Sequence, residues 1–512
     1  MRIPIGLSLL GGVAGLALGV SACSQPPEAG PPNIILFLVD DLGWQDTSVP
    51  FGSESTPFNQ RYRTPNMERL AAEGVKFTQA YSSAVCSPTR VSMLTGMNAA
   101  RHRVTNWTLR RDFSQDIHDD FLEFPSWNMN GLQPVDSIPN AVYATTLAQI
   151  LRSSGYATLH VGKAHWGAMD TPGSEPLNLG FEVNIGGHAA GAPGSFQGER
   201  FFGNSGAGAY TPPWGVPGLE KYHGDTINLT HALTLEAIEA MDNARKSGKP
   251  FFLHMSHYTV HTPIEPDRRF YDYYLEMGLD ETEARYASMI EGMDRSLGDL
   301  MDYLDRNQLA NNTILIFTSD NGGLSAVARG GERHHHNLPL RSGKGSAYEG
   351  GIRVPLLVKW SRGANPGSVC SEVLMAEDYF PTLLEMAGIS DYSVVQSIDG
   401  RSFVPLLKGK NWPDERVLVW HYPNKWGAEG PGIGSTSSVR QGEWKLIYWY
   451  ASGEKELYHI ESDIGEEINL AAANPEKANK LSGILSDYLR KVNAVRPTFR
   501  ENREPVPWPD ER

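Results

Sequence analysis

Cys86 is the residue of this sequence whose surroundings most strongly suggest chemistry. The chain of 512 residues has only three cysteines, and this one begins a Cys-Ser-Pro-Thr-Arg segment that ends at Arg90. Pro88 favours the first turn of a helix, so the sulfur would lie at a positive helix end and near a guanidinium group. The alternative is a small buried side chain, because free cysteines behave as small hydrophobic residues. The segment alone fits both interpretations.

Two clusters of oxygen-bearing side chains could bind a cation. Asp40 and Asp41 follow the apolar run 33–39, and Asp320 and Asn321 follow another apolar run. Carboxylate and amide oxygens are the ligands of hard cations such as Ca²⁺ and Mg²⁺. The Asp-Asn-Gly-Gly sequence that starts at residue 320 would by itself be interpreted as a turn. Because a second acidic cluster also follows a strand-like run, a metal site is the better interpretation.

Lysine and histidine side chains add groups that could bind an anion or move a proton. A single residue of either type is usually a surface residue or a satisfied core residue. Lys163, His165 and His261, however, follow apolar runs whose ends are expected to lead into one crevice. Their common location argues against an ordinary surface or core role. The candidates of this kind are Arg90, Lys163, His165, His261 and Lys344.

Four apolar runs predict central strands of a sheet that is covered on both faces. Helical patterns separate them, and strands that alternate with helices predict an α/β fold. We therefore expect a large, mainly parallel mixed sheet flanked by helices. In such sheets the ligand crevice lies at the carboxyl ends of the strands, where all four polar clusters fall. The predicted strands are 33–39, 157–161, 250–255 and 313–318, and the predicted helices are 147–152, 226–245 and 286–304.

A smaller unit is predicted in the C-terminal part of the chain. Short segments rich in β-forming residues, separated by turns, predict a small antiparallel sheet that one helix closes. The predicted strands are 417–422, 437–440, 444–450 and 456–460, and the predicted helix is 481–492. The expected organisation is a main domain at 33–408, a C-terminal α+β subdomain at 409–495 and an irregular tail at 496–512.

The N-terminus has the pattern of an export signal. Arg2 precedes the apolar region 5–20, which is too short and too weak for a convincing membrane span. The Val-Ser-Ala-Cys sequence that ends at Cys23 resembles the lipobox of bacterial lipoproteins. This resemblance implies a signal peptide at 1–22, lipidation of Cys23 and a flexible linker at 23–32. We expect an exported bacterial protein that is lipid-anchored to a membrane, in the periplasm or at the cell surface; the alternative is ordinary secretion.

Charge and cysteine content exclude other classes of protein. The net charge of −14 argues against a nucleic-acid partner. It also means that a local cationic pocket must capture any anionic substrate. With Cys23 assigned to lipid and Cys86 set aside, Cys370 has no partner, so we expect no disulfide framework.

The segment from Cys86 to Arg90, followed by Thr95-Gly96, resembles the signature of type I sulfatases, which belong to the alkaline phosphatase superfamily. In that family the cysteine is converted to Cα-formylglycine. Other blocks resemble family motifs in the expected order, so the resemblance covers nearly everything after residue 33. One departure is Ala164, where many relatives carry Trp. The blocks are Asp40–Gly43, Thr64–Met67, Gly162–His165, His261–Pro263, Ser319–Gly322, Gly343–Gly345, Glu349–Pro355, Gly442–Ile447 and Glu456–Tyr458.

The resemblance implies a sulfatase that hydrolyses sulfate esters through a formylglycine hydrate at position 86. One hydroxyl of the hydrate, held by the metal, would attack sulfur and form a covalent sulfate hemiacetal. The other hydroxyl would lose its proton, the aldehyde would re-form, and sulfate would leave by elimination. A formylglycine-generating enzyme or a radical maturase would be needed to modify Cys86.

The family mechanism also implies a role for each candidate side chain. His165 would act as the base in the elimination, and His261 would protonate the departing alcohol oxygen. The two lysines, Lys163 and Lys344, would hold sulfate oxygens. Arg90 would pair with the acidic cluster and orient the hydroxyls of residue 86.

The implied cofactor is one Ca²⁺ ion. Its ligands would be Asp40, Asp41, Asp320, Asn321 and the oxygen carried by modified Cys86. Three carboxylates and an amide oxygen suit the larger coordination shell of Ca²⁺, whereas Mg²⁺ would usually keep more waters.

The substrate is less evident from the sequence. Loops after the catalytic core bind the leaving group in related sulfatases, and the candidates here are Arg103, Trp107, His188 and His336. Ordinary packing is the alternative for the tryptophan, and a solvated loop is the alternative for the histidine triplet 334–336. An exported enzyme meets polymers, so the expected substrate is a sulfated carbohydrate, with galactose-type residues of a polysaccharide as a specific candidate.

Two alternative functions stay open at this point. The first is a phosphate or phosphonate monoester hydrolase of the same superfamily. The second is an inactive glycan-binding surface lipoprotein, which would follow if Cys86 stays unmodified.

Overall fold

The computed structural model describes residues 1, 3–4, 6, 30–205, 213–326 and 329–512. The chain divides into two units, Met1–Gly30 and Pro31–Arg512. The predicted signal peptide is largely outside the described residues, as are Cys23 and most of the linker 23–32. Among the described residues, no helix combines the length and the apolar character that a membrane crossing requires.

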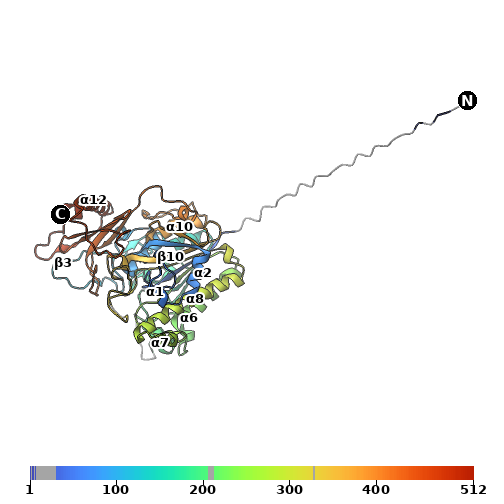
Figure 1. Ribbon diagram of the computed structural model, residues 1–512. Helices are drawn as coiled ribbons and strands as arrows, with labels where there is room; N and C mark the ends of the chain where they lie inside the picture. Colours follow the sequence, from blue (N-terminus) through green and yellow to red (C-terminus); the bar gives the residue numbers. More distant parts are fainter. Residues whose placement is uncertain (2, 5, 7–29, 206–212, 327–328) are drawn as a thin grey trace. The chain divides into compact units, whose positions relative to one another are not determined.

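A sheet of eight strands forms the centre of the second unit (Figure 1). The strand β10 runs antiparallel to both of its neighbours, and all other neighbouring strands pair in parallel. The predicted mainly parallel mixed sheet is thus confirmed. The order across the sheet is β11 (Ser368–Cys370), β2 (Val75–Tyr81), β10 (Arg353–Trp360), β9 (Thr313–Ser319), β1 (Asn33–Val39), β8 (Phe251–Ser256), β6 (Ala157–Gly162) and β7 (Val183–Ile185).

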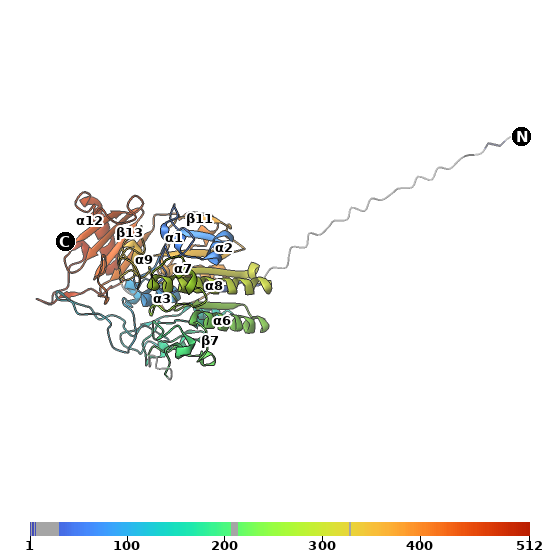
Figure 2. The same cartoon turned by 60° about the horizontal axis from the view of Figure 1, so that its bottom comes forward.

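Each face of the sheet has its own apolar core. Ile35 and Phe37 of β1 belong to the core that includes α6 and α8, which lie side by side in Figure 2. Ile34 and Leu36 belong to the opposite core, with α3, α5 and α10. Both faces are therefore covered, which explains why the central strands are continuously apolar. The helices of this unit before residue 410 are α1 (Pro57–Arg61), α2 (Pro65–Glu73), α3 (Cys86–Thr95), α4 (Ala99–His102), α5 (Leu147–Ser153), α6 (Leu229–Lys246), α7 (Tyr271–Glu276), α8 (Glu281–Arg306), α9 (Glu349–Ile352), α10 (Tyr379–Met386) and α11 (Val404–Leu407).

The predicted strands correspond to β1, β6, β8 and β9, and the predicted helices correspond to α5, α6 and α8. The sequence analysis did not predict β2, β7, β10 or β11. Short paired segments outside the main sheet are β3 (Leu122–Glu123), β4 (Leu132–Gln133), β5 (Val142–Tyr143) and β16 (Thr498–Phe499).

The predicted C-terminal sheet is also confirmed. Its strands follow one another as an antiparallel meander, and the helix α12 (Pro475–Lys491) packs on it around a separate apolar core. In the tail, β16 pairs with β3, and Trp508 is buried in the same core. The strands are β12 (Val417–Tyr422), β13 (Thr436–Gln441), β14 (Trp444–Trp449) and β15 (Lys455–His459).

A buried ion-pair network joins this C-terminal sheet to the main domain. Lys445 of β14 is fully buried, and its Nζ lies 3.0 Å from Glu349 Oε1 and 2.8 Å from Glu466 Oε1. Arg353 lies 2.8 Å from the other oxygen of Glu349, at the start of β10. Glu349 begins the short helix α9, five residues after Lys344. The C-terminal sheet thus braces the segment that follows Lys344.

Candidate active site

The polar clusters meet at the carboxyl ends of the central strands of the main sheet. Asp40 and Asp41 follow β1, Asp320 follows its neighbour β9, and Lys163 follows β6. The backbone N–H of Asp41 donates to Asp320 Oδ1 at 3.2 Å, which links the first two strand ends directly. The loop after β8 carries His261 to the same place. The parallel pairing of β9, β1, β8 and β6 brings these carboxyl ends together, as expected for a parallel sheet.

Cys86 is the first residue of α3, and its side chain is 3% exposed. Its Sγ lies 3.7 Å from Asp40 Oδ1. Burial raises the pKa of the Cys86 thiol to about 12. A thiol with such a pKa stays protonated near neutral pH and is a weak nucleophile. The unmodified cysteine is therefore poorly suited to attack an ester.

The oxygens beside Cys86 fit a hard cation. One ligand atom from each of Asp40, Asp41, Cys86 and Asp320 lies within 4.8 Å of the others. Two buried oxygens here, Asp41 Oδ2 and Asn321 Oδ1, have no hydrogen-bond partner. Buried acceptors without a donor are costly, and a cation would satisfy both. The residues present thus fit the predicted metal.

Three cations face the three carboxylates of this cluster. Arg90 Nη2 lies 2.8 Å from Asp320 Oδ2, and Lys163 Nζ lies 2.7 Å from Asp40 Oδ2. Lys344 Nζ lies 2.6 Å from Asp41 Oδ1. Burial opposes ionisation of Asp320, but Arg90 and Lys163 outweigh it and hold the pKa of Asp320 below its usual range. Burial raises the pKa of Asp40, although Lys163 opposes this. Each carboxylate nevertheless has a cationic partner, and a bound dication would add positive charge that attracts an anion.

Arg90 also ties neighbouring strand ends together. Its Nη1 donates to the carbonyl oxygen of Lys163 at 2.9 Å and to Ser256 Oγ at 2.7 Å. Ser256 is the last residue of β8. One guanidinium group of α3 therefore contacts the end of β8 and the residues that directly follow β6 and β9, which places residue 86 against the carboxylates.

His165 presents a free ring nitrogen at the site. Its Nε2 donates to the carbonyl oxygen of Thr108 at 2.7 Å, and its buried Nδ1 has no partner. Because a carbonyl only accepts, the proton lies on Nε2 and Nδ1 is available as a base. Burial lowers the pKa of His165, which also favours the neutral ring. Gly191 lies so close that an added Cβ would be 2.3 Å from this ring.

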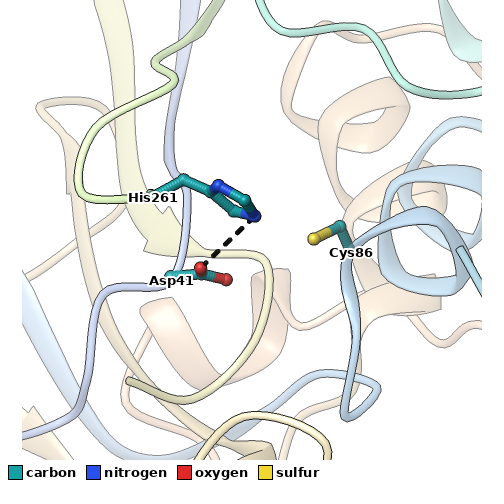
Figure 3. Close-up of side chains that lie close together, drawn as sticks. All are labelled: Asp41, Cys86 and His261. Atoms are coloured by element: carbon teal, nitrogen blue, oxygen red, sulfur yellow. Dashed lines mark ion pairs between the residues drawn. The ribbon is translucent and has the colours of Figure 1, made fainter. Parts of the chain in front are cut away.

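His261 faces Cys86 from the other side, next to Asp41 (Figure 3). Its Nδ1 donates to the carbonyl oxygen of Thr262 at 2.8 Å, and its Nε2 lies 3.7 Å from Asp41 Oδ2. Burial lowers the pKa of His261 to about 3, while the Asp41 carboxylate acts in the opposite direction. The imidazole is thus positioned to exchange a proton at Nε2, on the side of Cys86.

A pocket of about 420 Å³ lies beside these groups. Its volume is within the usual range of small-molecule sites. Cys86, His165, His261 and Lys344 all line it. We call this the Cys86 pocket. Its walls also include three tryptophans, Trp107, Trp214 and Trp426.

Of the four predicted substrate-binding residues, Trp107 lines the Cys86 pocket and the other three do not. Arg103 turns toward the C-terminal subdomain and donates to the carbonyl oxygen of Asn493. His188 lines a separate pocket, and His336 is buried with its Nε2 on the carbonyl oxygen of Gly330. Tertiary contacts turn these three side chains away from the Cys86 pocket.

Two of the tryptophans in the pocket wall, Trp214 and Trp426, were not predicted. Trp426 belongs to the C-terminal subdomain, and its ring centre lies 5.7 Å from Lys344 Nζ, within cation–π range. Gly345 lies beneath the ring: it has φ of +85°, and an added Cβ would be 2.2 Å from Trp426. Both tryptophans are in loops without periodicity. The only signal in the sequence was the presence of tryptophan in segments rich in Gly and Pro.

Comparisons with known proteins agree on one family. The model of the family described as Sulfatase matches residues 32–389. A second model, described as N-sulphoglucosamine sulphohydrolase, C-terminal, matches residues 343–494. The two matches together cover the main sheet and the C-terminal sheet.

Individual relatives are similar over most of their length. A protein of Formosa agariphila named Sulfatase is 30% identical over 93% of this chain and 92% of the relative. The human N-acetylgalactosamine-6-sulfatase is 28% identical over 94% of this chain and 88% of the relative. The crystal structure of Ps i-CgsB in complex with k-i-k-neocarrahexaose has a TM-score of 0.69 and 25% identity, and it covers 90% of this chain and 93% of that chain.

The unpartnered oxygens of the cluster predict a measurable metal affinity. We expect Asn321→Ala to weaken Ca²⁺ binding about 10-fold or more, because it removes one of the two unpartnered oxygens. Isothermal titration of the purified protein with CaCl₂, after treatment with a chelator, measures this directly. Asn321→Asp keeps a ligand oxygen and is expected to retain binding. Unchanged Ca²⁺ affinity in Asn321→Ala would contradict the assignment.

Proposed function

Since this chain belongs to the sulfatase family and is a sulfuric ester hydrolase, we propose that it releases sulfate from a sulfated carbohydrate by way of a formylglycine formed from Cys86. The observation that carries this proposal is the position of Cys86. It begins a helix, lies beside the three carboxylates of the cluster, and shares a pocket with Lys344 and two histidines. Its buried thiol has a raised pKa, so conversion to another group supplies the nucleophile that the thiol does not.

Two groups would complete this site. Asp40, Asp41, Asp320 and Asn321 would hold the metal, which we propose to be Ca²⁺ because all of these ligands are oxygens. When bound, the ion supplies Lewis acidity and lowers the pKa of a nearby hydroxyl. The hydrated aldehyde at position 86 supplies two hydroxyls on one carbon, one to attack sulfur and one to drive release of sulfate.

Lys163 and Lys344 are the groups proposed to hold the sulfate. Both lie beside the carboxylates that follow β1, one on Asp40 and one on Asp41. A sulfate group next to residue 86 would therefore lie near two ammonium groups, that of Lys344, which lines the pocket, and that of Lys163, which is fully buried. Such contacts offset charge that develops on the sulfate oxygens in the transition state.

The two histidines are proposed to move protons on different atoms. His165, with Nε2 held by Thr108, would accept a proton at Nδ1 from a hydroxyl of residue 86. His261, with Nδ1 held by Thr262, would give a proton from Nε2 to the departing alcohol oxygen. This role requires the doubly protonated ring, which the Asp41 carboxylate favours and burial opposes. Arg90 is the positioning residue, because it contacts Asp320 and fixes the first turn of α3.

A carbohydrate as leaving group is supported by the pocket and by one relative. Three tryptophans with partly exposed rings line the pocket, and aromatic walls suit the apolar face of a sugar ring. The similar crystal structure of Ps i-CgsB holds k-i-k-neocarrahexaose. Galactose-type residues of a polysaccharide stay the specific candidate.

The proposal predicts a preference for sulfate over phosphate esters. We expect kcat/KM for a sulfated monosaccharide to exceed that for the matching phosphate ester at least about 100-fold. Sulfate and phosphate release from galactose 6-sulfate, N-acetylgalactosamine 6-sulfate and their phosphate counterparts measures this. Cys86→Ala should abolish turnover, whereas the matched variant Cys370→Ala should keep it, because Cys370 lies in β11 outside the pocket. Faster phosphate release would favour a phosphohydrolase, and turnover of small aryl sulfates alone would exclude the carbohydrate substrate.

We also propose that Cys23 is lipidated and anchors the protein to a membrane, outside the cytoplasm. The support is the lipobox-like Val-Ser-Ala-Cys sequence after an apolar region. Expression in a bacterium fed a labelled fatty acid should label the wild type and leave Cys23→Ala unlabelled. Equal labelling of the two proteins would exclude this anchor.

A further inference from the structure

The Cys86 pocket has an apolar wall that comes from separate parts of the chain. Trp107 follows α4, Trp214 precedes α6, and Trp426 comes from the C-terminal subdomain. Each of these rings is only partly buried, so part of each remains available for contact. Pro193 and Leu324 complete this wall. The leaving group of the substrate would therefore meet mainly aromatic and aliphatic surface.

The polar groups of the pocket are few, and all belong to the reaction centre or lie next to it. Among its described lining residues, Lys344 is the only lysine or arginine, and none is Asp, Glu, Asn or Gln. Lys344 already faces Asp41 at 2.6 Å. The other cations of the cluster, Arg90 and Lys163, have fully buried side chains and also face carboxylates. No described wall residue is thus free to pair with a second anionic group.

Arg103, the arginine predicted to bind substrate, points elsewhere. Arg103 donates to the carbonyl oxygen of Asn493 and does not line the pocket. A second sulfate or a carboxylate that points from the bound ring toward this wall would meet tryptophan and proline side chains and, among the described residues of the wall, no cation. Burying an anion without a partner costs far more than any apolar contact recovers.

We propose that the Cys86 pocket selects a neutral sugar ring that carries one sulfate, and excludes rings with a second sulfate or a carboxylate. This inference rests on the proposed sulfatase function. The single sulfate would use the cations and the metal of the cluster, while the ring packs against the tryptophans. The pocket would discriminate because the described residues of its wall include no cation. A second anionic group would lose its hydration without gaining a partner, so the doubly charged ring would bind more weakly.

The test compares singly and doubly sulfated forms of the same sugar. For the mature protein we expect kcat/KM for N-acetylgalactosamine 6-sulfate, or for galactose 6-sulfate, to exceed that for the corresponding disulfate at least about 100-fold. Comparable or faster turnover of the disulfates would overturn the inference and leave the proposed function intact. Absence of sulfate release from every sugar would overturn both.

A pair of variants tests whether the lack of a cation on the wall causes the discrimination against disulfated sugars. Ala192 is a small, partly exposed residue of the pocket wall, so a longer side chain can be accommodated there. Ala192→Lys should raise relative turnover of the disulfate about 10-fold or more, because it supplies the partner that the wall lacks. Ala192→Gln adds similar length without charge and should leave the ratio of the two substrates unchanged. The same ratio in both variants would contradict the charge-based selection.

Discussion

Three buried carboxylates and three buried cations hold the site together. Asp320 pairs with Arg90, Asp40 with Lys163, and Asp41 with Lys344. Charges removed from water are strongly destabilising unless they are paired, so these contacts determine where each loop can lie. The pairs join the ends of β1, β6 and β9 to the first turn of α3. The groups proposed to bind metal and sulfate are therefore the same groups that keep the loops in place.

The C-terminal subdomain takes part in this arrangement through two contacts. Lys445 lies between Glu349 and Glu466 and braces the segment after Lys344. Trp426 covers Gly345 and lies beside the ammonium group of Lys344. The C-terminal subdomain thus contributes Trp426 to the pocket wall and supports the segment that carries Lys344. Differences in this subdomain can consequently change substrate selection without altering the residues around Cys86.

Much of the fold could be predicted because the central strands are buried on both faces. Such strands are continuous apolar runs, and polar residues directly after them indicate the carboxyl edge of the sheet. The antiparallel strand β10 was missed because Pro355 interrupts its pattern, and its pairing with β2 shifts register between Val354 and Leu356. The strand β2 was missed as well, since its partly buried positions, Lys76, Thr78 and Gln79, are polar and interrupt the apolar run.

The reaction centre could be predicted in outline, but the substrate wall could not. Asp40, Asp320 and Lys163 are at strand ends, where topology alone brings them together. The direction of a loop side chain depends instead on distant contacts. Arg103 turns to Asn493, whereas Trp426 reaches Lys344 from the next subdomain, and no local pattern distinguishes these outcomes.

The central claim is that Cys86 is a precursor and that its thiol is absent from the working enzyme. The mass of the peptide that contains residue 86, taken from protein purified from its native host, tests this most directly. The account predicts a mass in which the CH₂–SH group is replaced by an aldehyde, together with reaction with a hydrazide and no alkylation by iodoacetamide. An unmodified, alkylatable thiol in active protein would contradict it.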